Sequence, residues 1–137
     1  MVNLASAFGL LVLAPLAALA VDPRPICDGL GPPANTEDAQ ACINWLRDQG
    51  SRIFATERWG STVCSHGRAE ISIVSRGIKD WASSSSGATI AAAAQVVLDT
   101  CKDSNGGVEG GAISDGNPHH LEVSIHLPVS MQPGWGK

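Results

Sequence analysis

The sequence predicts an α+β fold, a two-layer sandwich in which two helices cover one face of an antiparallel sheet of about five strands. Three observations lead to this prediction. Two segments carry apolar residues at helical spacing. Shorter segments alternate apolar and polar residues between turn residues, which is typical of strands with one solvated face. Finally, only the second helix could serve as a crossover between parallel strands, which favours an antiparallel sheet.

The first twenty residues have the pattern of a secretory signal peptide. Phe8 to Ala20 is apolar throughout and closes on Ala18-Leu19-Ala20, the small-x-small pattern that signal peptidase cleaves. The run is shorter than the roughly 20 apolar residues of a membrane-spanning helix, and Pro15 interrupts it. We therefore expect residues 1–20 to be removed and the mature chain to be secreted, beginning at Val21, without stable membrane insertion.

The mature chain is expected to form one domain over residues 21–127, followed by a flexible tail over residues 128–137. All 9 basic and 13 acidic residues lie beyond Ala20, so the mature chain carries the whole formal net charge of −4. This acidic balance argues against nucleic acid or an anionic membrane as a partner.

Four cysteines in an exported chain predict two disulfides. They are Cys27, Cys42, Cys64 and Cys101. Their spacing contains no CxxC, which argues against a zinc cage or a redox-active pair. Four cysteines allow three pairings, and the sequence leaves them open. A helix that carries Cys42 above the strand that Cys64 enters would favour joining these two, which leaves Cys27 to join Cys101.

The first helix is expected to begin at Asn35 or Thr36, after a proline-rich arm, and to end at Gly50. Asn35 can cap its N-terminus, with Asp38 three positions on. The apolar stripe at i, i+3, i+4 and i+7 consists of Ala39, Cys42, Ile43 and Leu46. Trp45 lies at the edge of this stripe and is expected in the core.

Three strands are predicted next, over residues 52–56, 62–65 and 68–75, with a tight turn at 65–67. The core-facing side chains of the third strand are expected to be Ala69, Ile71 and Ile73. Residues 76–87, which include the serine run 83–86, are too small and polar to pack and are expected to form a loop.

The second helix is expected over Ala88–Lys102, with Ser85 or Ser86 as its cap. Its apolar positions are Ile90, Ala94, Val97 and Cys101. Two further strands are predicted over residues 108–113 and 121–127, separated by a turn at 115–118.

The residues that could carry chemistry form no recognisable constellation in the sequence. The histidines are His66, His119, His120 and His126. His120 and His126 would share a face of the last strand about 20 Å apart, too far for one metal, whereas His119 would point to the opposite face. We interpret all four as surface histidines, and we predict no catalytic, cofactor-binding or metal-ligating residue.

Other motifs are equally incomplete. The glycine-rich stretch 105–116 lacks the order of a phosphate-binding loop, and the serines 83–86 have no base identifiable in the sequence. Carboxylates that could serve a glycosidase are Glu57, Glu70, Glu109 and Glu122, but nothing in the sequence pairs them. Trp59 and Trp81, in or beside loops, are the candidate surface recognition residues; packing over the core margin is the more common role of such tryptophans.

A resemblance to known proteins is carried by short motifs over residues 27–127. They are ACINWL at 41–46, VCSHG at 63–67, VLDTC at 97–101, GGVEGG at 106–111, Gly116-Asn117 and LEVSI at 121–125. With these motifs the chain resembles fungal small secreted proteins of the killer-toxin-like and extracellular effector groups. The resemblance implies an antiparallel sheet with two helices on one face. It also implies further cysteines in relatives, near the positions of Ile53 and Gly87 in this chain.

Two functions of different class follow from these observations. The first is an effector-like or toxin-like interaction protein that acts on a host or competitor through its folded surface, with an extracellular protein or a glycan as partner. The second is a small secreted hydrolase or carbohydrate-active protein, and a wall or coat component is a third alternative. The absence of a catalytic motif favours the first.

Overall fold

The computed structural model describes residues 24–27, 31–77 and 82–132. The predicted signal peptide and Trp81 lie outside the described residues. Two helices occur within them, α2 (Thr36–Asp48) and α3 (Gly87–Cys101). The strands are β1 (Ala34–Asn35), β2 (Ile53–Thr56), β3 (Ser61–His66), β4 (Ala69–Ser75), β5 (Ser83–Ser86), β6 (Gly107–Val108), β7 (Gly110–Ser114) and β8 (Leu121–His126), and a 3-10 helix, η2 (Val129–Met131), follows.

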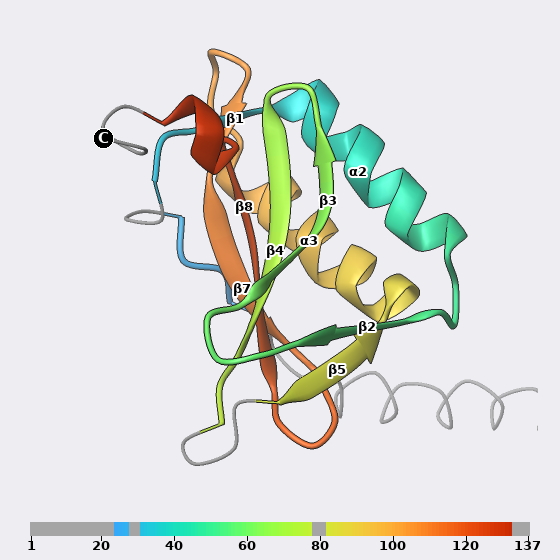
Figure 1. Cartoon of the computed structure of the whole chain (residues 1–137). Helices are drawn as coiled ribbons and strands as arrows, with labels where there is room; N and C mark the ends of the chain where they lie inside the picture. The colour runs from blue at the N-terminus through green and yellow to red at the C-terminus, as the bar shows by residue number, and fades with distance from the viewer. Residues whose placement is uncertain (1–23, 28–30, 78–81, 133–137) are drawn as a thin grey trace, which may run out of the picture.

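The main sheet has four antiparallel strands in the order β3-β4-β8-β7. Helix α2 packs on β3 and β4, α3 packs on β7 and β8, and the two helices pack on each other (Figure 1). The predicted α+β class is therefore confirmed. The main sheet has four strands and not the expected five, because β2 pairs with β5 in a separate two-stranded sheet. Strands β1 and β6 form another two-stranded sheet.

The serine run 83–86, expected to be a loop, is strand β5. It pairs with β2 in register, Ile53 opposite Ser86 and Thr56 opposite Ser83. Ser83 and Ser85 are buried, and the Ser83 hydroxyl bonds the carbonyl of His119. A run of four serines has no alternation of apolar and polar residues, so its hydropathy pattern does not predict a strand.

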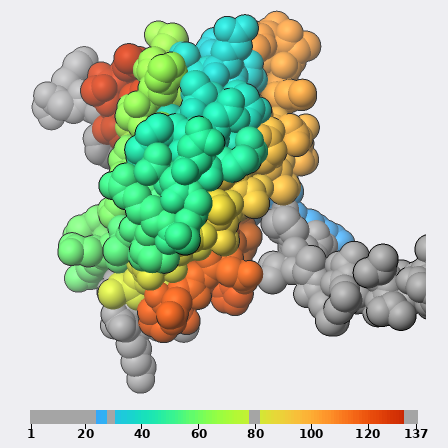
Figure 2. All heavy atoms as spheres, turned by 90° about the vertical axis from the view of Figure 1, so that its right-hand side faces the viewer, coloured from blue at the N-terminus to red at the C-terminus, as the bar shows by residue number. Residues whose placement is uncertain are grey.

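The core lies between the helices and the inward face of the main sheet. Its fully buried large side chains include Ile43 and Leu46 of α2, Ile90 and Val97 of α3, Ile71 and Ile73 of β4, and Leu121, Val123 and Ile125 of β8. Each such side chain stabilises the fold by about 1.5–3 kcal/mol relative to exposure. The predicted inward orientation of the alternate residues of β4 is confirmed. Figure 2 shows the molecule from the side that the helices cover, where α2 crosses the front with part of α3 beside it.

Both helix starts follow the predicted capping chemistry. The Asp38 N–H donates to Asn35 Oδ1 at 3.0 Å, and the Thr89 N–H donates to Ser86 Oγ at 3.2 Å. Helix α2 ends at Asp48, and Gly50 beyond it adopts φ +56°, a conformation that favours glycine. The predicted caps and the predicted stop are thus confirmed.

All four cysteines are paired. Cys42 of α2 bonds Cys64 of β3, and Cys27 of the N-terminal arm bonds Cys101 at the end of α3. This is the pairing that the placement of Cys42 above its strand favoured. The arm also adds to the edge of the sheet, because the N–H and C=O of Ile26 exchange hydrogen bonds with Gly111 of β7.

The chain beyond β8 is hydrogen-bonded to the segment before β1. Residues 128–132, assigned to a flexible tail from the sequence, include the 3-10 helix η2. The Leu127 N–H donates to the carbonyl of Pro32 at 3.1 Å, and Gln132 Nε2 donates to the carbonyl of Leu127 at 2.8 Å. Residues 133–137 lie outside the described part of the chain.

Candidate functional site

A polar groove lies on the face of the main sheet that the helices leave uncovered. Side chains alternate along a strand, so the residues between the core positions of β4 and β8 point to this face. The groove has a volume of about 380 Å³ and is lined by Trp59, Gly60, Ser61, Thr62, Glu70, Ser72, Val74, Glu122, Ser124, His126 and Val129. Its residues come from the turn before β3, from β3, β4 and β8, and from η2.

The strand register arranges the floor of the groove in rows. Ser72 of β4 lies between Thr62 of β3 and Ser124 of β8, which places three hydroxyl residues side by side. Directly opposed residues have Cβ atoms about 4.5–5.5 Å apart. Glu70 opposes His126 on one side of this row, and Glu122 lies in the row on the other side. The groove therefore offers hydroxyls at its centre and charged or ionisable groups at both ends.

His126 is held by two hydrogen bonds. Its Nδ1 lies 2.9 Å from the carbonyl oxygen of Leu127, and its Nε2 lies 3.1 Å from Ser72 Oγ. A carbonyl only accepts, so Nδ1 carries the proton and Nε2 of the neutral ring accepts from the Ser72 hydroxyl. His126 is only 9% exposed, so the prediction of a surface histidine is wrong here. Sequence spacing placed it on the solvated face but could not reveal partners on β4.

Glu70 completes this cluster. Its Oε1 accepts a hydrogen bond from the Thr62 hydroxyl at 2.9 Å, and it lies 3.5 Å from Ser72 Oγ and 4.0 Å from His126 Nε2. At the other end of the groove, Glu122 Oε2 accepts from Arg76 Nη1 at 3.1 Å. One of the two carboxylates thus has a cationic partner, whereas the other is held among hydroxyls and an imidazole.

The other three histidines lie elsewhere. His66 is near Asp38, with 3.9 Å between Nε2 and Oδ1, and His120 is near Asp115, with 3.9 Å between Nδ1 and Oδ1; both histidines are exposed. His120 precedes β8 rather than lying on it. His119 is half-buried, and its Nε2 has no hydrogen-bond partner among the described residues. The structure does not bring the four histidines together.

Trp59 stands at the rim of the groove with 85% of its surface exposed. The guanidinium carbon of Arg58 lies over its ring, 4.9 Å from the centroid, which is a cation–π distance. Packing over the core margin, the more common role of a loop tryptophan, is therefore not what Trp59 does: this candidate recognition residue lies at the surface beside a concavity. The sequence placed it in a loop but gave no sign that the loop borders the polar face of the sheet.

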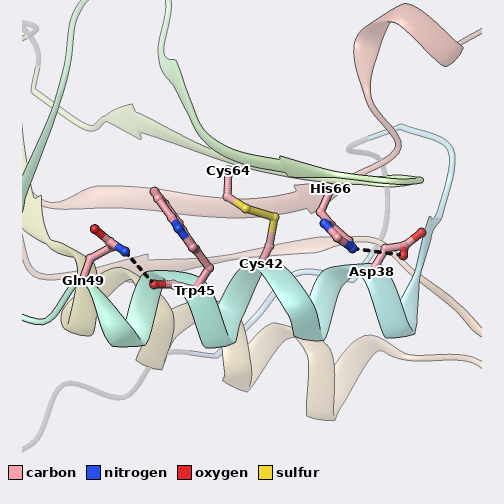
Figure 3. Close-up of a disulfide and its surroundings, with 6 residues drawn as sticks. All are labelled: Asp38, Cys42, Trp45, Gln49, Cys64 and His66. Atoms are coloured by element: carbon pink, nitrogen blue, oxygen red, sulfur yellow. Dashed lines mark hydrogen bonds and ion pairs between the residues drawn. A yellow bond between two sulfur atoms is a disulfide. The ribbon is translucent and has the colours of Figure 1, made fainter.

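Trp45, which was expected in the core, is 41% exposed. Its ring packs edge-on against Phe54 with 6.0 Å between centroids. It lies on the side of α2 that faces the Cys42–Cys64 disulfide (Figure 3). The expectation is corrected because the strand pair β2-β5, which carries Phe54, covers only the margin of α2.

A second concavity lies beside this disulfide. It has a volume of about 360 Å³ and is lined by Ala41, Trp45, Val63, Cys64, Ser65 and His66. At its end Asp38 Oδ2 accepts the Arg68 N–H at 2.8 Å, and His66 points toward the same carboxylate (Figure 3). The turn against Asp38 lies at Gly67, φ +54°, and Arg68; Ser65 and His66, which were expected in this turn, belong to β3. These contacts dock the β3–β4 turn on α2, a structural role.

The four carboxylates considered for a glycosidase do not lie at one site. Glu70 and Glu122 line the groove, whereas Glu57 and Glu109 do not. The register puts Glu70 and Glu122 four residues apart along neighbouring strands, roughly 13 Å at about 3.3 Å per residue. Paired glycosidase carboxylates lie about 5–9.5 Å apart. This spacing argues against a glycosidase centre in the groove.

Within residues 24–27, 31–77 and 82–132, no three His, Cys, Asp or Glu side chains gather closely enough to hold a metal ion. In the same part of the chain, neither helix is long and apolar enough to cross a membrane.

Fold and site together define a class of protein: a small α+β domain held by two disulfides, with a polar groove on the uncovered face of its main sheet. The chain belongs to the family described as Domain of unknown function (DUF8794), whose model matches residues 23–127. The match includes all four cysteines and every strand and helix from β1 to β8. No curated protein matches the chain.

Proposed function

We propose that this protein is a secreted, non-enzymatic interaction protein, effector-like or toxin-like, that acts on a host or competitor through its folded surface. The recognition surface is the groove on the open face of the main sheet. One observation carries this assignment: Trp59 is 85% exposed at the rim of a polar concavity. An exposed tryptophan forgoes the large apolar burial that a core would give it, and tryptophan is enriched where proteins bind partners.

Secretion is supported by two independent features. The first twenty residues have the signal-peptide pattern, and the mature chain has two disulfides, which form and persist in oxidising compartments. The two helices on one side of a sheet with an open opposite face support a two-layer sandwich. That architecture is the one implied by the resemblance to killer-toxin-like and extracellular effector proteins.

The test compares binding by the mature protein and by a Trp59→Ala variant to intact cells and isolated cell walls of plants and fungi. We expect the variant to lose most of the binding while its melting temperature stays unchanged, because the side chain makes little contact with the fold. Ile53→Ala is the matched control, since Ile53 is an apolar residue, 61% exposed, that does not line the groove. Equal binding by the Trp59 variant and the native protein would remove the groove as the recognition surface.

A second candidate function is a small secreted hydrolase, favoured by the contact between Ser72 and His126. The hydroxyl donates to Nε2 at 3.1 Å, and the carbonyl of Leu127 fixes Nδ1, as the base of a nucleophilic serine requires. The surroundings argue against it. Ser72 lies within β4, between β3 and β8, so the neighbouring backbone N–H groups lie in the sheet plane and cannot form an oxyanion hole.

A fluorophosphonate probe separates the two functions. In a hydrolase, Ser72 Oγ would bond to phosphorus, fluoride would leave, and the hydroxyl proton would pass to His126 Nε2. We expect no labelling of the native protein by mass spectrometry. Labelling at Ser72 that disappears in His126→Gln would replace the interaction protein with the hydrolase.

A further inference from the structure

We propose that the ligand of the groove is a neutral glycan, bound with the apolar face of one pyranose ring on Trp59 and with its hydroxyls on the floor between Glu70 and Ser124. This inference rests on the proposed function, because it names the partner of the same surface.

The aromatic rim provides the stacking surface. A pyranose ring presents C–H groups on one face, and these pack on an indole ring as other apolar groups do. Trp59 is 85% exposed, so most of the ring is available to a ligand. Arg58 lies 4.9 Å from its centroid on one side, which restrains the ring and lowers the entropy lost when a ligand stacks on the other side.

The floor provides matched hydrogen-bonding groups. Sugar hydroxyls both donate and accept, so they need carboxylates and hydroxyls within reach of one ring. Glu70 Oε1 accepts from Thr62 at 2.9 Å, and an ionised carboxylate offers about four lone-pair sites, so it can accept more than this bond. Ser124 Oγ has no hydrogen bond to the described residues and opposes Ser72 at the centre of the floor.

Size and charge select the class of glycan. The groove volume of about 380 Å³ lies at the lower end of the roughly 300–1,000 Å³ of small-molecule sites, which suits one or two rings. Two carboxylates line it, and Arg76 pairs with only one of them. A uronic acid or a sulfated sugar would meet like charge there. A neutral pyranose meets no such repulsion.

The experiment titrates the mature protein with four neutral hexasaccharides, based on glucose with β-1,3 or β-1,4 links, on xylose, and on N-acetylglucosamine. Binding is measured by calorimetry and by tryptophan fluorescence. We expect at least one to bind, with affinity reduced more than ten-fold in Trp59→Ala and several-fold in Glu70→Gln, which preserves side-chain shape. Trp45→Ala is the control, because Trp45 lies at the other concavity, and it should bind as the native protein does.

The outcomes separate this inference from the function on which it rests. If no neutral hexasaccharide binds but attachment to cells still depends on Trp59, the glycan assignment fails and the recognition surface stands, with a protein as its partner. If neither hexasaccharides nor cells depend on Trp59, both fail. Tighter binding of hexagalacturonate than of any neutral sugar would also overturn the proposal, because the two carboxylates should disfavour it.

Discussion

Among single residues, the groove depends most on His126, a polar residue at the end of β8 that is buried. The strand alternates core residues with polar ones, and His126 occupies a polar position yet is buried to 9% exposure. It can be buried because both ring nitrogens have partners, Ser72 and the carbonyl of Leu127. A buried polar group that is fully hydrogen-bonded lowers the stability of the fold little, whereas one that loses its partner lowers it by the free energy of its desolvation.

The first prediction therefore concerns His126→Ala. The substitution removes two hydrogen bonds at a buried site, so we expect it to lower the free energy of unfolding by about 1–3 kcal/mol in urea denaturation. His120→Ala is the control, because the His120 side chain is 62% exposed and its loss should change stability by less than about 0.5 kcal/mol. If instead His126→Ala abolished binding or activity at unchanged stability, the imidazole would be a chemical group of the site.

Among the helices and strands, those with a clear apolar pattern in the sequence were predicted, and those without one were missed. Helix α2 was predictable because its stripe and its cap agree, and β4 was predictable because apolar and polar residues alternate over its whole length. Strand β5 was hidden because a run of serines has no such pattern. Its conformation is imposed by pairing with β2, a contact between segments far apart in the chain.

The groove was only partly predictable for the same reason. Alternation showed that Glu70 and Ser72 face away from the core, and that Ser124 and His126 do so too. It did not show that β4 and β8 are neighbours, which is what brings Ser72 to the His126 ring. Two solvated faces rich in hydroxyl and carboxyl groups were the one available signal for this site.

The second prediction concerns the start of α2. Asn35→Ala removes the acceptor of the Asp38 N–H and should cost about 0.5–2 kcal/mol of stability. Asn44→Ala, in the same helix, is the matched control: its side chain accepts exposed hydrogen bonds from Gln40 and Arg47, which contribute little. Thermal denaturation of both variants gives the comparison. Similar losses in the two variants would show that the Asn35 side chain contributes no more than an exposed helix residue does, and would contradict its role as a cap.

At the scale of the whole molecule, a modest core and two disulfides share the work of stabilisation. The helices and the inward face of the sheet supply the buried aliphatic side chains. The disulfides add covalent links to this packing: Cys42–Cys64 ties α2 to the edge strand β3, on which it also packs, and Cys27–Cys101 ties the N-terminal arm to the end of α3. Such a division is common in small disulfide-bonded domains.

The third prediction is that the secreted protein begins at Val21. The small-x-small pattern closes on Ala20, and the polar, proline-containing segment that follows it is typical of a mature N-terminus. N-terminal sequencing of protein from the culture medium after expression in a eukaryotic host is the measurement. Retention of Leu13 in the exported protein would contradict cleavage. The mass should show no N-linked glycan, because no asparagine is followed by x-Ser or x-Thr.

The fourth prediction compares the two disulfides. The bridged cysteines are 22 residues apart in Cys42–Cys64 and 74 residues apart in Cys27–Cys101. The chain-entropy model then gives contributions of about 3.4 and about 4.5 kcal/mol respectively. We expect paired Cys→Ala substitutions to lower the melting temperature by more than about 10 °C in each case, and further for the longer loop. Differential scanning calorimetry of the two double variants measures this.

The same two variants test how the groove is supported. Cys64 lies on β3, the strand that supplies Ser61 and Thr62 to the groove, whereas Cys27 lies on the arm beside β7, at the other edge of the sheet. Binding measured well below both melting temperatures should therefore weaken on loss of Cys42–Cys64, because β3 is then an edge strand without its covalent tie to α2. It should persist on loss of Cys27–Cys101, although that variant is expected to be the less stable one. If binding followed stability alone, the groove would depend on the fold as a whole and not on the position of β3.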